Sequence, residues 1–190
     1  LEIVSSNRDK SLEELLEAGI EDKREKLVQK LGENIVVRRI AASKDSADSS
    51  GVYLHSNSKI GTIISLEGGT EEVAKDIAMH AAATDPMAIS PSDISQDVIE
   101  KEREIYKAQS EESGKPADIV EKMIEGKIRK FLSEVSLTEQ DFVKDPSIKI
   151  NDILINNNAT IVGFTRFEVG EGIEVEKVDF ASEVMSQIEG

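Results

Sequence analysis

The sequence predicts an α+β fold in two halves, with a long helical hairpin that projects from the body of the protein. Helix-period and strand-period apolar patterns alternate along the chain as helices, strands, a helix, the hairpin, a helix, strands and a last helix. The turn residues Gly114, Lys115 and Pro116 separate two charged stretches of helical character. The 190 residues are enough for one good core or two small ones.

Two helices are expected at the start of the chain. Ser11 and Glu14 have the spacing of a capping box, and Gly19 is expected to end the first helix. A second helix is predicted over residues 21–31, with Gly32 as its C-terminal stop.

Three strands are predicted next, because the apolar period changes and β-branched residues become frequent. They cover residues 35–40, 52–55 and 60–66, and a polar loop is expected over residues 44–50. The short connections indicate an antiparallel meander that helices cover on one face.

A helix is predicted to begin after Thr70 and to end at Asp85, which precedes a proline. His80 shares its apolar stripe with Val73 and Ile77. The surrounding alanines keep this surface small, so that another backbone can approach it closely.

The hairpin is predicted from a helix over residues 95–113, a three-residue turn and a second helix over residues 117–134. Gly114 suits the position just past a helix end, and Pro116 suits the first turn of the next helix. The second helix has one apolar face, formed by Val120, Ile124, Ile128, Phe131 and Val135. A helix pair packed on a sheet is an alternative that the pattern favours equally.

The C-terminal part is predicted to add a short helix capped by Ser147 and a strand over residues 160–169. A turn at residues 170–172, a continuation of the strand over residues 173–178 and a last helix over residues 180–188 follow.

Composition excludes several classes of function. Lys and Arg number 23 against 38 Asp and Glu, and the net charge of −15 repels nucleic acids and anionic membranes. Without cysteine, the chain has neither disulfides nor a thiol nucleophile. It contains no long apolar run and no signal peptide, so a cytoplasmic location in bacteria, or an organelle matrix, is expected. Because it begins with Leu1, we expect a fragment of a longer protein.

No pattern of catalytic or metal-binding residues emerges, so we predict no catalytic residue, no metal and no cofactor. The two histidines, His55 and His80, lack metal-ligand spacing, and His55 is interpreted as an exposed structural residue. Gly68 and Gly69 are interpreted as turn residues rather than as a phosphate-binding loop. The carboxylates are scattered along helices, so they do not define a catalytic pair. An interaction protein is therefore favoured over an enzyme.

Several short stretches, taken together and in order, carry a resemblance to a known family. They are Gly32 to Arg39, Lys59-Ile60-Gly61, Asp76 to Ala82, Val98 to Glu102, Gly114-Lys115-Pro116, Ile119 to Gly126, Phe142 to Ser147, Arg166 to Glu174 and Asp179-Phe180-Ala181. Over roughly residues 21–187 the chain resembles elongation factor Ts, which releases GDP from elongation factor Tu.

The resemblance implies two core subdomains, each a small antiparallel sheet with covering helices. The first would cover residues 1–84 and the second residues 85–178, with a coiled-coil hairpin inserted at 95–135. A short C-terminal helix would form a module over residues 179–190.

The resemblance also implies the partner and the mechanism, which is exchange without bond chemistry. Side chains of the factor would wedge near the nucleotide site of GDP-bound elongation factor Tu and weaken its hold on the β-phosphate and Mg²⁺. The residues implied to contact the partner are Ile60, Gly61, Met79, His80, Phe180 and Met185.

His80 has two interpretations. The residue pattern favours a histidine packed beside Ile77, whereas the resemblance favours a wedge that faces the partner. The wedge hypothesis predicts that His80→Ala slows exchange with little change in stability.

The chain departs from the family pattern at its start. The N-terminal helical module and the Thr-Asp-Phe-Val motif of the family are absent, and Asp141-Phe142-Val143 matches a different family segment. We therefore expect partner binding with reduced exchange activity. A module that only binds elongation factor Tu or forms a homodimer is an alternative, and an acidic hydrolase is another.

Overall fold

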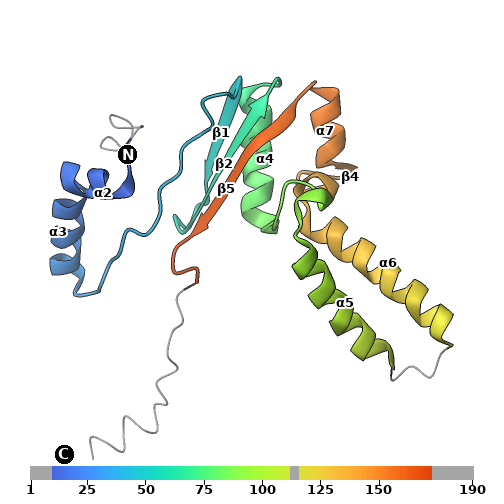
Figure 1. Ribbon diagram of the computed structural model, residues 1–190. Helices are drawn as coiled ribbons and strands as arrows, with labels where there is room; N and C mark the ends of the chain where they lie inside the picture. The colour runs from blue at the N-terminus through green and yellow to red at the C-terminus, as the bar shows by residue number, and fades with distance from the viewer. Residues whose placement is uncertain (1–9, 112–115, 173–190) are drawn as a thin grey trace, which may run out of the picture.

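The computed structural model describes residues 10–111 and 116–172, and it combines helices with two small antiparallel sheets (Figure 1). The predicted α+β class is confirmed at this level. The larger sheet contains β1 (Ser49–Leu54), β2 (Ile60–Glu67) and β5 (Thr160–Glu168), with β2 in the centre. The smaller sheet pairs β3 (Asp141–Phe142) with β4 (Asp145–Lys149).

The N-terminal helices follow the predicted boundaries. Ser11 caps α2 (Leu12–Leu15) in a capping box with Glu14, and a π-helical turn (Leu16–Ile20) leads into α3 (Glu21–Leu31). Gly19 has a φ of 114° and kinks the helical segment where a stop is predicted. Gly32 ends α3 in the left-handed conformation, as its position predicts.

The strand predicted over residues 35–40 is wrong. Residues 34–44 form no strand, and the segment runs along the sheet as an extended strap, which we define as residues 33–48. Its backbone is held by other groups: the Arg24 guanidinium donates to the Ile35 carbonyl at 3.0 Å, and the Lys44 amide donates to the Ser65 hydroxyl at 3.0 Å. β-Branched residues fit any extended, half-buried backbone, so they mark this conformation without proving a sheet partner.

The third strand of the larger sheet comes instead from the C-terminal part of the chain. β5 lies antiparallel to β2, and Ile63 is opposite Thr165. The predicted subdomains 1–84 and 85–178 therefore share this sheet, while their division stays a prediction.

α4 (Glu71–Thr84) covers one face of the larger sheet. Thr70 caps its start, and the helix ends before Asp85, as predicted. Gly51 permits the close contact, since a Cβ at this position would lie 2.2 Å from the Ala74 carbonyl carbon. The strap covers the opposite face, where a Cβ at Gly163 would meet the Lys44 side chain at 2.8 Å.

The core lies between the sheet, α4 and the short helix α7 (Ile150–Asn156). Ser147 lies in β4 rather than at a helix start, so its predicted capping role is wrong, and Lys149 occupies the N-cap of α7. The buried apolar residues of this core are Ile64, Leu66, Ala74, Ile77, Ala78, Ala81, Leu137, Phe142, Ile150, Leu154 and Ile161.

The helices α5 (Gln96–Glu111) and α6 (Ala117–Val135) lie side by side and project away from the sheet (Figure 1). The segments at their base are joined: the Met87 amide donates to the Val135 carbonyl at 2.8 Å, and the Leu137 amide to the Ala88 carbonyl at 2.9 Å. A 3-10 turn (Pro91–Asp93) precedes α5, and another (Leu137–Glu139) follows α6. Supercoiling of the pair as a coiled coil stays a prediction.

Candidate functional site

Two of the predicted contact residues, Ile60 and Gly61, begin β2 and are both half-buried. The Thr62 hydroxyl donates to the Ala78 carbonyl at 2.6 Å, which places this end of β2 beside the second half of α4. Alternate residues of a strand face opposite sides. Ile60 therefore shares the α4 side of the sheet with Thr62, whereas Gly61 faces the strap.

His80 is fully buried near the C-terminal end of α4, with its exposed fraction at 0%. Its Nε2 lies 3.0 Å from Gln140 Oε1, and its Nδ1 accepts a hydrogen bond from the Val143 amide at 3.3 Å. The ring centroid is 6.0 Å from that of Phe142. These contacts match the packed interpretation of His80 in the free chain.

The hydrogen bonds fix the protonation state of His80. Because the Val143 amide can only donate, Nδ1 carries no proton, and Nε2 donates to Gln140. Burial lowers the pKa of His80, and the hydrogen bond to Gln140 opposes that shift. The ring is therefore a neutral bridge between α4 and the residues around Phe142.

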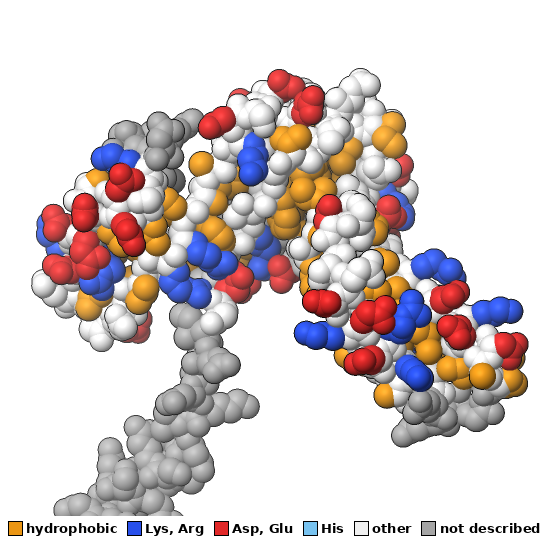
Figure 2. All heavy atoms as spheres, in the orientation of Figure 1, with side chains coloured by type: hydrophobic (Ala, Val, Ile, Leu, Met, Phe, Trp, Pro, Cys, Tyr) orange, Lys and Arg blue, Asp and Glu red, His pale blue; other side chains and the backbone are white. Residues whose placement is uncertain are grey.

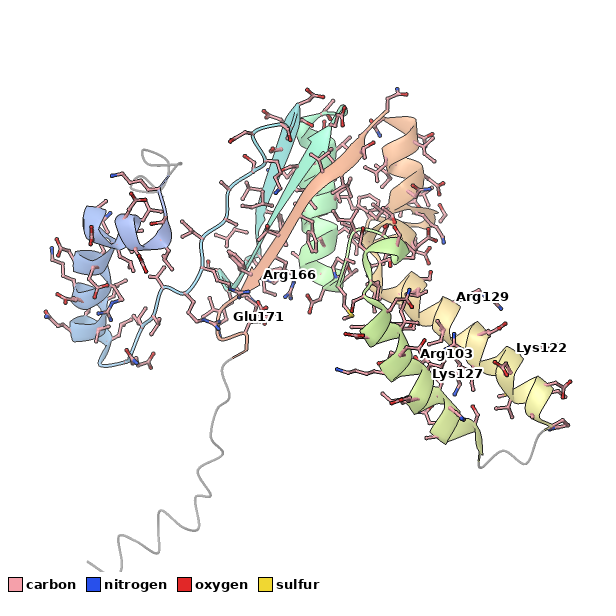
Figure 3. All side chains as sticks on the ribbon, in the orientation of Figure 1. Arg103, Lys122, Lys127, Arg129, Arg166 and Glu171 are labelled. Carbon is pink, nitrogen blue, oxygen red and sulfur yellow. The ribbon has the colours of Figure 1, made fainter. Side chains whose placement is uncertain are left out.

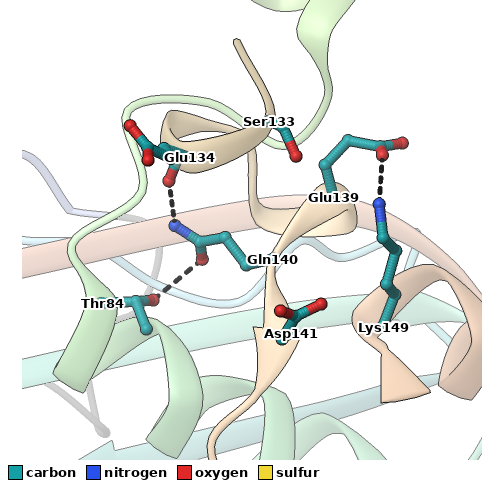
Figure 4. A pocket seen from close by; sticks show the side chains of 7 residues that line it. All are labelled: Thr84, Ser133, Glu134, Glu139, Gln140, Asp141 and Lys149. Carbon is teal, nitrogen blue, oxygen red and sulfur yellow. Dashed lines mark hydrogen bonds and ion pairs between the residues drawn. The ribbon is translucent and has the colours of Figure 1, made fainter. Parts of the chain in front are cut away.

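Gln140 connects this bridge to the base of the hairpin. Its Nε2 donates to the Glu134 carbonyl at 2.7 Å, and its Oε1 lies 2.9 Å from the Thr84 hydroxyl. Gln140 lines a cavity of about 530 Å³, together with Thr84, Ser133, Glu134, Glu139, Asp141 and Lys149 (Figure 4). Within the lining of this cavity, the Lys149 ammonium donates to the Glu139 carboxylate at 3.0 Å. One side chain therefore contacts α4 and α6 together.

The loop between β3 and β4 lies against α4, and the periodicity of the sequence does not indicate this contact. Val143, 41% exposed, is held through its amide by His80, and the Lys144 ammonium is 2.6 Å from the Asp76 carboxylate. Met79, half-buried, comes from the same part of α4. An exposed apolar side chain is thus fixed next to His80, one of the predicted contact residues.

The strap forms the wall of a second cavity, of about 950 Å³, which Gly61 also lines. Arg39 holds the strap, because its guanidinium lies 4.4 Å above the Phe167 ring centroid and 3.1 Å from the Glu171 carboxylate. The hydrogen bond from Arg39 lowers the pKa of Glu171. Figure 3 shows Glu171 beside the end of β5, near Arg166.

The part of the chain that the structure describes contains no group of side chains arranged to bind a metal ion. Over residues 10–111 and 116–172, no three acidic or histidine side chains come together in a way that could hold a metal ion. No described helix is both long enough and apolar enough to cross a membrane. His55 is half-buried in the turn after β1, where its Nδ1 lies 3.4 Å from the Asn57 amide.

Several predicted residues lie outside the described part of the chain. These are the contact residues Phe180 and Met185, the turn residues Gly114 and Lys115, the strand continuation at 173–178 and the helix at 180–188.

Comparison with known proteins gives one consistent result. A model of the family described as Elongation factor TS matches residues 1–171. The chain is 56% identical over 176 residues to Elongation factor Ts of Hahella chejuensis, covering 93% of this chain and 61% of that protein. It is 52% identical over 187 residues to Elongation factor Ts of Francisella tularensis subsp. novicida, covering 95% of this chain and 64% of that protein. The chain thus spans less than two thirds of the length of these relatives.

Proposed function

The chain belongs to the elongation factor Ts family, and from this premise we propose that it is a guanine-nucleotide exchange factor of translation elongation. Its partner would be elongation factor Tu in the GDP-bound state. The family match over residues 1–171 is the observation that carries the proposal. Bacterial cytoplasm is the location that fits the organisms of its relatives.

The proposed mechanism is thermodynamic coupling without bond chemistry. The factor would bind elongation factor Tu more tightly when the nucleotide site has lost GDP and Mg²⁺. Bound GDP would lower the affinity of elongation factor Tu for the factor by the same ratio as the factor lowers its affinity for GDP. A coupling of about 4 kcal/mol corresponds to a ratio of nearly a thousand, at roughly 1.4 kcal/mol per tenfold change.

Ile60, Gly61 and Met79 are the described residues that we propose for direct contact, since each is half-buried and retains exposed surface. Phe180 and Met185 are proposed to add contacts from the C-terminal module.

His80 would then act as a positioning residue. Its burial and two hydrogen bonds suit a role in holding the loop at Val143, and Gln140 extends that connection to the hairpin. Contact between His80 and the partner would require this network to open.

A second candidate function is partner binding without full exchange activity. Because His80, the residue of the wedge hypothesis, is buried in the free chain, we propose as the alternative that the chain only binds elongation factor Tu or pairs as a homodimer.

The test is release of fluorescently labelled GDP from elongation factor Tu as this chain is added. Saturable acceleration is the expected result. If the chain does not accelerate release but competes with a full-length factor, the alternative holds. If the chain shows neither acceleration nor competition, binding to elongation factor Tu is refuted in both candidates. Sedimentation would then test the homodimer that remains.

A further inference from the structure

The outward side of α6 combines two cations, a glycine and an exposed apolar side chain. We define the α6 outer face as Ile119, Lys122, Gly126 and Arg129. Their spacing of three, four and three residues places them on one side of the helix, opposite the buried Ile124 and Ile128.

Gly126 has no structural explanation within the described chain. It lies inside a helix with ordinary helical backbone, where glycine is less stable than alanine. A Cβ at this position would have no heavy atom within 4 Å. The space above Gly126 is therefore open, and the missing side chain leaves the backbone bare on the outside of the hairpin.

Two unpaired cations flank this bare backbone. Lys122 and Arg129 are exposed, and neither forms an ion pair within residues 10–111 and 116–172. Figure 3 shows both on the α6 side that points away from α5, and Figure 2 shows basic side chains along this edge of the hairpin. Lys127, by contrast, turns inward to Gln109 at 3.2 Å and to the Tyr106 ring at 5.1 Å.

The spacing of Lys122, Gly126 and Arg129 indicates what kind of partner surface would fit them. Lys122 and Arg129 are seven residues apart, about 10.5 Å along the helix axis. A facing α-helix repeats its side chains at the same interval, so carboxylates seven residues apart would meet both cations. Gly126 lies between them and allows the two backbones to approach closely, while Ile119, 44% exposed, adds apolar contact.

Other occupants fit less well. A symmetric pairing of the face with a second copy, centred on Gly126, would place Lys122 opposite Arg129 and set like charges together. A nucleic acid would gain nothing from the bare backbone at Gly126, because its phosphates need only the cations and not a close contact between two backbones.

We propose that the α6 outer face docks an acidic α-helix of another protein, with carboxylates on Lys122 and Arg129 and a close backbone contact at Gly126. This site lies on the hairpin, apart from the residues proposed to contact elongation factor Tu, and it does not depend on the exchange function.

The test uses the full 190-residue chain and a fluorescein-labelled helical peptide of alanine with glutamates repeated every seven residues on one face. Anisotropy at low salt would measure its affinity. We expect K122E/R129E to weaken binding at least tenfold. The matched control K101E/K107E changes the same charge on α5 and should weaken it less than threefold.

Gly126 is tested separately because a charge effect alone would not require it. We expect G126A to raise the Tm, and G126L to weaken peptide binding about tenfold while the protein stays folded. Equal binding by G126L and wild type would overturn the close contact, and equal losses in the two charge variants would overturn the site. Tighter binding of a U20 RNA, or self-association that K122E/R129E abolishes, would also overturn the proposal.

Discussion

Replacing His80 with alanine separates the two interpretations of this residue. The structure assigns to the side chain two hydrogen bonds, at 3.0 and 3.3 Å, and an aromatic contact with Phe142. Each hydrogen bond contributes about 1 kcal/mol, and the aromatic contact adds about 1 kcal/mol. We therefore expect His80→Ala to lose about 3 kcal/mol of stability, or a Tm lower by about 6–12 °C for a chain of this size.

Thermal unfolding followed by circular dichroism would measure this loss, with His55→Ala as the control because His55 is not part of the core. Two further variants separate the bonds. His80→Asn places an acceptor near Nδ1 for the Val143 amide, and His80→Gln places a donor near Nε2 for Gln140. Each should retain part of the lost stability.

An unchanged Tm in His80→Ala together with slower GDP release would contradict the buried position of the ring. That combination would mean that the ring is exposed in solution and acts as the wedge that the family resemblance implies.

Three further predictions concern the sheet, the pH dependence and the strap. Gly51→Ala would press a methyl group into the Ala74 backbone, so we expect a loss of about 3 kcal/mol or more in chemical unfolding, and a loss below about 0.5 kcal/mol would contradict the packing of α4. Because the pKa of His80 is lowered in the folded chain, the unfolded chain takes up a proton at a higher pH. The contribution of neutral His80 to stability is therefore present above about pH 6.5 and is lost as the pH falls below it. Between about pH 7.5 and pH 5.5 the free energy of unfolding should fall more in wild type than in His80→Gln, and an equal fall in both would exclude this contribution. Glu171→Gln removes an exposed ion pair with Arg39 and should change the stability of the whole chain little, yet trypsin should cleave the strap faster; an unchanged cleavage rate would show that the ion pair does not hold the strap.

The sequence predicts those elements whose signals are local. Thr70 and Ser11 cap the helices that their side chains indicate. β2 lies where its β-branched residues predict it, whereas β1 begins at Ser49, inside the loop predicted over residues 44–50. These signals depend only on residues that are close in the sequence, so the predictions made from them do not depend on tertiary contacts.

The failures involve partners distant in the chain. Residues 35–40 have strand composition, but β5 takes the free edge of β2, and a choice between two possible partners cannot be made from either segment alone. The same reason hides the site around His80. Gln140 and Val143 reach it through tertiary contacts 60 and 63 residues away, which no periodicity records.

The affinity of this chain for elongation factor Tu, measured by calorimetry with and without bound GDP, tests the proposed exchange function most directly. Coupling predicts that the nucleotide-free partner is bound more tightly, and that the ratio of the two Kd values equals the loss of GDP affinity that the chain causes. Equal Kd values in both states would contradict the account, because a protein that binds the two states equally cannot shift the equilibrium between them.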